Sequence, residues 1–165
     1  MKVTELYPEG VFHVVQNMRE KDKVEIYATQ WNDEPTIFAT EVCRYGNFAF
    51  IGHADDGEPV VAAGAVPRWD GVWQLWMFAT DRFPEIAMSA HRFAKTVFFP
   101  SLDAAGWHRL EAHSIGTHDV AHRWLEKLGA YKESEMTNYG KRGESFFVYC
   151  WTKKPADTQS TETNV

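Results

Sequence analysis

Hydrophobic and polar positions follow two different periods along the chain, and each period predicts a different kind of element. Apolar residues recur every three or four positions from Val11 to Met18, which predicts an amphipathic helix. Residues 72–79 form a near-continuous apolar run, which is typical of a strand buried on both faces. Together with turn residues, these signals predict helices at residues 11–18, 36–44, 85–105 and 119–128, and strands at residues 2–7, 47–53, 59–66, 72–79, 109–114, 131–139 and 144–151.

The charged segment at residues 19–28 leaves two possibilities open, a second amphipathic helix or a continuation of the first. Within it Arg19, Asp22 and Glu25 are spaced three apart, so they share one helix face and can pair there. We interpret this trio as a solvated or locking ion network, and a functional role is the alternative. The predicted order is β, α, α, β, β, β, α, β, α, β, β, an α/β (α+β) fold with a mixed sheet flanked by helices.

Length and composition predict one globular domain over residues 1–154, because 44% of the 165 residues are hydrophobic. Residues 155–165 are almost entirely polar and are predicted to form a disordered tail. The net charge of −6 argues against nucleic acid or an anionic membrane as a partner, since both favour basic surfaces. The sequence shows no secretion signal and no run of about 18 apolar residues, so no membrane segment is expected. Cys43 and Cys150 are predicted to be buried free thiols in a reducing compartment.

The central apolar strand, the helix after it and the strand at residues 109–114 suggest a βαβ unit. The ligand site of such a unit usually lies beyond the C-terminal end of the first strand, here residues 80–82. Residues 121–130 form an alanine-led helix that ends in Glu-Lys-Leu-Gly-Ala. With the order of elements, this helix resembles the signature of the GNAT (acyl-CoA N-acyltransferase) family before its last hairpin. The resemblance covers most of residues 1–154 and implies a GNAT-like fold.

The segment that would hold the cofactor's diphosphate departs from the GNAT pattern. The family has a glycine-rich loop there, because backbone N–H groups at a helix N-terminus must reach the diphosphate and Cβ atoms would block them. Residues 80–87 contain no glycine, Pro84 has no N–H, and Asp81 and Glu85 add negative charge. No cofactor is therefore expected. If acetyl-CoA binds nonetheless, its expected contacts are Met77, Phe78, Ala79 and Arg82.

The catalytic positions of the family are also changed. The resemblance places Leu125 where many of these enzymes have a tyrosine general acid, and His118 where they have an asparagine. His113, at the end of its strand, is a candidate general base, and a structural histidine is the alternative. His118 and His122 are spaced like a zinc-binding pair, but no third ligand has suitable spacing, so no metal is expected.

A closer resemblance is carried by four segments of the chain. They are Arg19-x-x-Asp22-x-x-Glu25, Gly57 to Val60, Trp76 to Asp81, and Ala121 to Leu125. Together they are similar to a family of GNAT-like phage proteins that includes the small internal, core-associated virion protein of short-tailed phages. This resemblance implies assembly of the phage head or internal core through contacts with head or core proteins, without acetyl transfer. It places the protein in the virion or the host cytoplasm.

Two other functions stay open at this stage. One is an acetyl-CoA-dependent N-acetyltransferase with an atypical cofactor loop, and the other is a phage effector that binds a host protein. For a protein partner, the expected interface anchor is Trp69, which lies between Arg68 and Asp70 in a predicted turn.

Overall fold

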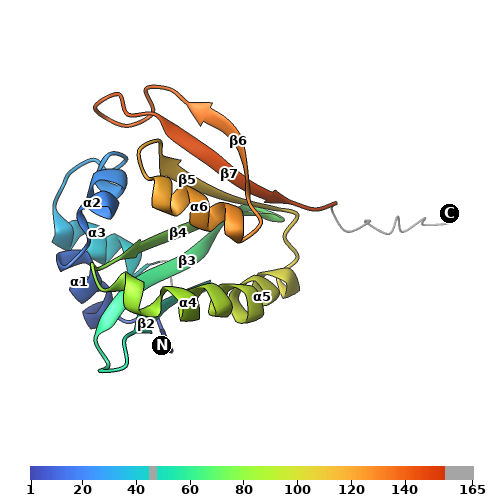
Figure 1. The fold of residues 1–165 in the computed structure, drawn as a ribbon. Helices are drawn as coiled ribbons and strands as arrows, with labels where there is room; N and C mark the ends of the chain where they lie inside the picture. The colour runs from blue at the N-terminus through green and yellow to red at the C-terminus, as the bar shows by residue number, and fades with distance from the viewer. Residues whose placement is uncertain (45–47, 155–165) are drawn as a thin grey trace, which may run out of the picture.

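The computed structural model describes residues 1–44 and 48–154, and in this part a seven-stranded sheet carries helices on both faces (Figure 1). The strand order is β1-β2-β3-β4-β5-β7-β6. The strands are β1 (Lys2–Glu5), β2 (Ala49–His53), β3 (Pro59–Trp69), β4 (Val72–Ala79), β5 (Arg109–Ile115), β6 (Tyr131–Met136) and β7 (Phe146–Thr152). The helices are α1 (Pro8–Gln16), α2 (Glu20–Tyr27), α3 (Pro35–Val42), α4 (Phe83–Phe93), α5 (Phe99–Ala104) and α6 (Asp119–Lys127), with a π-helical turn η2 (Ala94–Phe98). None of the helices in the described ranges is long and apolar enough to cross a membrane.

The predicted fold class is confirmed, and the structure adds detail to the helices. The charged segment at residues 19–28 is a separate helix, α2, so three helices precede β2 where the predicted order has two. The long helix predicted before β5 is interrupted by η2 and restarts as α5, with Pro100 in its first turn. The predicted start of a strand at Asn47 and the predicted tail at residues 155–165 lie outside the described residues.

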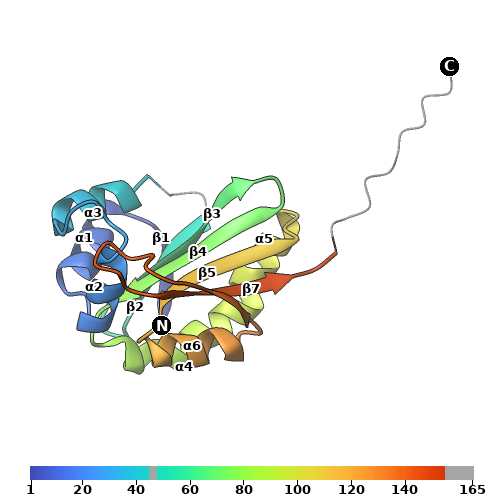
Figure 2. The same ribbon diagram turned by 90° about the horizontal axis from the view of Figure 1, so that it is seen from above.

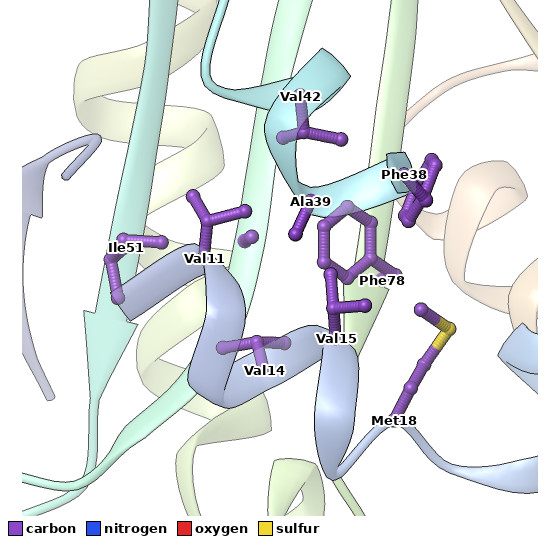
Figure 3. Packing of buried hydrophobic residues seen from close by; sticks show 10 residues of the cluster. Val11, Val14, Val15, Met18, Phe38, Ala39, Val42, Ile51 and Phe78 are labelled. Carbon is purple, nitrogen blue, oxygen red and sulfur yellow. The ribbon is translucent and has the colours of Figure 1, made fainter. Parts of the chain in front are cut away.

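The helices divide between the two faces of the sheet (Figures 1 and 2). Helices α1, α2 and α3 lie on one face, while α4, α5 and α6 lie on the other. On the first face, the apolar stripe of α1 packs against α3 and the sheet (Figure 3). That core cluster consists of Val11, Val14, Val15, Met18, Phe38, Ala39, Val42, Ile51, Ala62 and Phe78. The periodicity at residues 11–18 therefore describes the buried face of α1 correctly.

The small residues of β3 make room for aromatic side chains of the neighbouring strand. Gly64 is paired with Trp76 of β4. A Cβ atom on Gly64 would lie 2.7 Å from the Phe48 carbonyl oxygen and 2.8 Å from Cζ2 of Trp76. The absence of a side chain at this position thus lets the indole approach the strand closely.

Replacing Gly64 with alanine is expected to lower the free energy of unfolding by about 1–3 kcal/mol, because the added methyl group overpacks this site. Chemical denaturation monitored by tryptophan fluorescence measures the change. The matched control is Gly116→Ala, where a Cβ atom would meet its nearest neighbours at 3.4 Å, an ordinary contact distance. Equal stability losses in the two variants would contradict the prediction.

Candidate functional site

Strands β4 and β5 diverge at their C-terminal ends. They pair in parallel only from Val72↔Arg109 to Leu75↔Ala112. Beyond that point β4 continues along β3 and β5 continues along β7, each in an unbroken antiparallel ladder. The two central strands are therefore held on their outer edges and separate from each other, which leaves an opening in the middle of the sheet.

A groove runs from this opening between α4 and α6. Its volume is about 120 Å³, and its lining is predominantly apolar. Alanines on three elements, Ala90, Ala112 and Ala121, line it and keep it open. The indole of Trp124 on α6 also lines the groove, and its buried N–H has no hydrogen-bond partner among the described residues. The groove thus combines an apolar wall with an unused hydrogen-bond donor.

A second pocket lies on the opposite face, beside α2 and α3, with a volume of about 300 Å³. Its polar wall includes Arg68 of β3, Gln74 of β4 and Tyr139 beyond β6. The pocket and the groove share lining residues at the opening, which are Glu25, Leu75, Trp76, Met77 and His113. Cavities on the two faces of the sheet therefore meet where β4 and β5 separate.

The structure places His113 at this junction. Its side chain is 21% exposed, with Nε2 at 3.4 Å from Oε2 of Glu111. Its Nδ1 lies 3.5 Å from Nε2 of Gln74, and its ring meets that of Tyr139 edge-on. A neighbouring carboxylate can hold one ring N–H and leave the other nitrogen to accept a proton. The geometry suits the predicted role of general base, which stays a prediction.

Helix α2 fastens the diverging end of β4. The Asp22 carboxylate is 3% exposed, and its Oδ2 accepts a hydrogen bond from the Ala79 N–H at 2.8 Å. Arg19 pairs with the same oxygen at 2.8 Å, and its backbone N–H donates to the Ala79 carbonyl at 2.9 Å. Burial raises the pKa of Asp22, and the charge of Arg19 opposes this shift.

The same helix also fastens the end of β5. Oε2 of Glu25 accepts hydrogen bonds from the Ser114 hydroxyl at 2.7 Å and the Ile115 N–H at 2.9 Å. The buried ring of His118 completes the network, with Nδ1 at 3.2 Å from Glu25 and Nε2 at 3.7 Å from Asp22. The trio of Arg19, Asp22 and Glu25 is therefore a lock, buried at Asp22, that bridges the separated strand ends.

This lock changes the expected cofactor contacts on β4. The peptide groups of Ala79 are already paired with α2. The Thr80 N–H donates to Val60 of β3, so alternate residues, Phe78 among them, turn their peptide groups toward β3. By the same alternation, Met77 turns its peptide groups toward the opening, beyond the last β4–β5 pair. Of the three predicted backbone contacts, the geometry leaves Met77 for a ligand.

The fourth predicted contact, Arg82, is surrounded by carboxylates. Its guanidinium nitrogens lie 2.9 Å from Asp56, 3.0 Å from Glu58 and 2.7 Å from Glu85. Acidic residues of the β2–β3 turn and of α4 thus satisfy the one basic side chain at the start of α4. The hydrogen bonds from Arg82 also lower the pKa of Glu85, which keeps this carboxylate ionised at neutral pH.

The backbone donors at the start of α4 are also in use. The N–H groups of Phe83 and Glu85 donate to the carbonyls of Thr80 and Arg82, at 3.1 and 3.0 Å. The Arg82 N–H approaches the Thr80 hydroxyl at 3.3 Å, and Pro84 has no N–H. A diphosphate therefore does not fit this helix terminus.

The other predicted positions have separate surroundings. Leu125 lines the groove, so no hydroxyl stands where the family resemblance places a tyrosine. His122 Nε2 lies 3.0 Å from the Ile115 carbonyl, away from the partners of His118. Within residues 1–44 and 48–154, no group of three or more His, Cys, Asp or Glu side chains is arranged to hold a metal ion. Trp69 is 68% exposed at the end of β3, as a surface anchor requires. Cys150 is a buried free thiol as predicted, while Cys43 is only partly buried.

Sequence reasoning missed two residues that line the junction, Gln74 and Trp76. Their apolar surroundings in β4 predict only a strand buried on both faces. The available signal was the alternation of Gln74, Trp76 and Phe78, which places all three on the face toward α3. That Trp76 lies at an opening in the sheet could not be inferred, because the opening depends on where β5 stops pairing.

Comparisons with known proteins identify the fold. The structure is similar to Ard1 from Thermoplasma volcanium, with a TM-score of 0.71, 13% identity, and coverage of 93% of this chain and 97% of that one. A GNAT-superfamily phosphinothricin acetyltransferase from Sinorhizobium meliloti, in complex with AcCoA, gives a TM-score of 0.69 at 11% identity, covering 98% and 96% of the two chains. For yncA from Salmonella typhimurium, with its cofactor acetyl-CoA, the TM-score is 0.72 at 11% identity, with 97% and 98% covered. No protein-family model and no curated protein sequence matches the chain. The fold is that of the GNAT acetyltransferases, at identities that establish the fold alone.

Proposed function

We propose that the protein is an N-acyltransferase that joins an acyl thioester and an amine at the opening between β4 and β5. The single observation that carries the proposal is the meeting of two cavities at this opening, one on each face of the sheet. This arrangement lets two reactants approach one point from opposite sides. The similarity to acetyltransferases solved with acetyl-CoA supports the same assignment and makes acetyl the simplest acyl group.

The residues at the opening have separate roles in such a reaction. The indole N–H of Trp124 supplies a donor for a carbonyl group of the thioester arm, and the backbone edge at Met77 supplies pairing. The bound thioester supplies the activated acyl group. His113 takes a proton from the amine that enters through the pocket beside α3, and Glu111 orients its ring.

Thiol release tests the proposal directly. The purified protein is incubated with S-acetyl donors and a panel of primary amines, and free thiol is measured over time. Amine-dependent thiol release above that of an inactivated variant is the expected result. If no amine raises thiol release above the rate of the same mixture without protein, the proposal fails.

Leu125→Tyr is expected to raise the turnover of this reaction by about tenfold or more, because a phenol at the groove can protonate the departing thiolate. The measurement is the rate of thiol release at saturating donor. Leu125→Phe is the matched control, since it adds the ring without the hydroxyl. An equal rate in the two variants would show that proton donation does not limit turnover.

A non-catalytic role is the second candidate, and a specific observation favours it. The edge of β4 at Ala79 and the charge of Arg82 are both occupied by groups of the protein itself. The phage resemblance makes contacts with head or internal-core proteins the corresponding function, with exposed Trp69 as an anchor. This candidate predicts the protein in purified virions, loss of its incorporation on Trp69→Ala, and no amine-dependent thiol release.

A further inference from the structure

We propose that the groove takes its acyl donor through a pantetheine-type arm alone, so that the donor class is an acyl thioester recognised without the nucleotide diphosphate of CoA. This inference rests on the proposed function and deepens it, because it names the donor. The chemistry is unchanged by the missing nucleotide. The amine nitrogen forms a bond to the acyl carbon, the C–S bond breaks, and the proton lost by the amine ends on the released thiol.

Charge at the start of α4 opposes a diphosphate. Asp56, Glu58 and Glu85 gather around Arg82, and Asp81 is exposed beside it. Three carboxylates around one guanidinium give the start of α4 a net negative charge. A diphosphate brought to the same place would meet repulsion from groups of its own sign.

The positively charged side chain that lines the groove is also paired already. Arg19, the one lysine or arginine among the residues that line the groove, holds Asp22 at 2.8 Å. Its guanidinium carbon lies 5.1 Å above the centre of the Phe83 ring. Turning toward a phosphate would leave the Asp22 carboxylate buried without its partner, which is costly.

The interior of the groove suits the pantetheine half of such a donor. Apolar side chains line most of it, and the unpaired N–H of Trp124 is suited to a carbonyl oxygen, which carries no formal charge. A pantetheine arm has two amides and one thioester along a flexible apolar chain. The apolar lining, the Trp124 donor and the unpaired backbone edge at Met77 therefore suit such an arm without any contribution from phosphates.

Calorimetric titration of the full chain with three probes tests the inference. The probes are S-acetylpantetheine, acetyl-CoA, and adenosine 3′,5′-bisphosphate, which stands for the nucleotide half of CoA. We expect the first two to bind with dissociation constants within about threefold of each other, and the bisphosphate to show no binding. Acetyl-CoA binding more than about thirtyfold tighter than S-acetylpantetheine would overturn the inference, while thiol release from acetyl-CoA would leave the proposed function standing. Absence of binding by both thioesters would overturn the inference and the proposed function together.

A groove-filling variant locates the binding. Ala121→Leu adds bulk on the α6 wall of the groove and is expected to weaken S-acetylpantetheine binding by about tenfold or more. Ala104→Leu, at an exposed position at the end of α5, is the matched control and is expected to bind as the unmodified protein does. Equal binding by both variants would place the arm elsewhere and overturn the assignment to the groove.

Discussion

Replacing Asp22 with alanine is expected to lower the free energy of unfolding by about 3–5 kcal/mol, because it removes the acidic partner of a buried ion pair and leaves the basic partner in place. Asp22 is 3% exposed and receives both the Arg19 guanidinium and the Ala79 N–H. Its removal leaves a partly buried positive charge and an unpaired backbone donor at the end of β4. Chemical denaturation followed by circular dichroism measures the change.

Two further variants make this result specific. Asp22→Asn retains an oxygen that can accept from Ala79, and burial already raises the pKa of Asp22, so we expect a smaller loss than with alanine. Asp55→Ala removes a fully exposed carboxylate that lies 3.7 Å from the N-terminal amine, and is expected to change stability by less than about 0.5 kcal/mol. A loss below about 1 kcal/mol for Asp22→Ala would show that α2 does not lock the strand ends.

Replacing His113 with alanine is expected to lower kcat/KM for amine-dependent thiol release by about 10²–10⁴, the range of a lost general base. The imidazole lies where the groove and the pocket meet, with Glu111 at 3.4 Å. His91→Ala, which removes a histidine from α4, is the matched control and is expected to retain the full rate. A rate within twofold of the unmodified protein for His113→Ala would refute the assignment.

The pH dependence of kcat/KM distinguishes a general base from a structural histidine at position 113. If His113 accepts the proton, the unmodified protein loses kcat/KM as the solution becomes more acidic and the imidazole is protonated. The residual activity of His113→Ala is expected to lack this acidic limb. A variant that loses activity equally at every pH would point to a positioning role alone.

Much of the fold follows from local patterns in the sequence. The period of apolar residues defines α1, the run at residues 72–79 defines β4, and Asp-Gly within the turn after β2 defines the hairpin to β3. These features depend on neighbouring residues, so a single sequence carries them. The missing glycines after β4 were visible in the same way, and they already indicated a site without a phosphate cradle.

The tertiary structure decided what that site contains instead. Asp22 reaches Ala79 across 57 positions of sequence, and Arg82 meets Asp56 across 26. Glu25 joins α2 to Ser114, which is 89 positions away. Periodicity shows which face of an element is buried, but it carries no information on which distant carboxylate that face will meet. The sequence by itself therefore determined the strand–helix framework and the absence of glycine from residues 80–87. Only the packing of α2 across the ends of β4 and β5 determined the locked edge, the opening in the sheet and the two cavities that meet there.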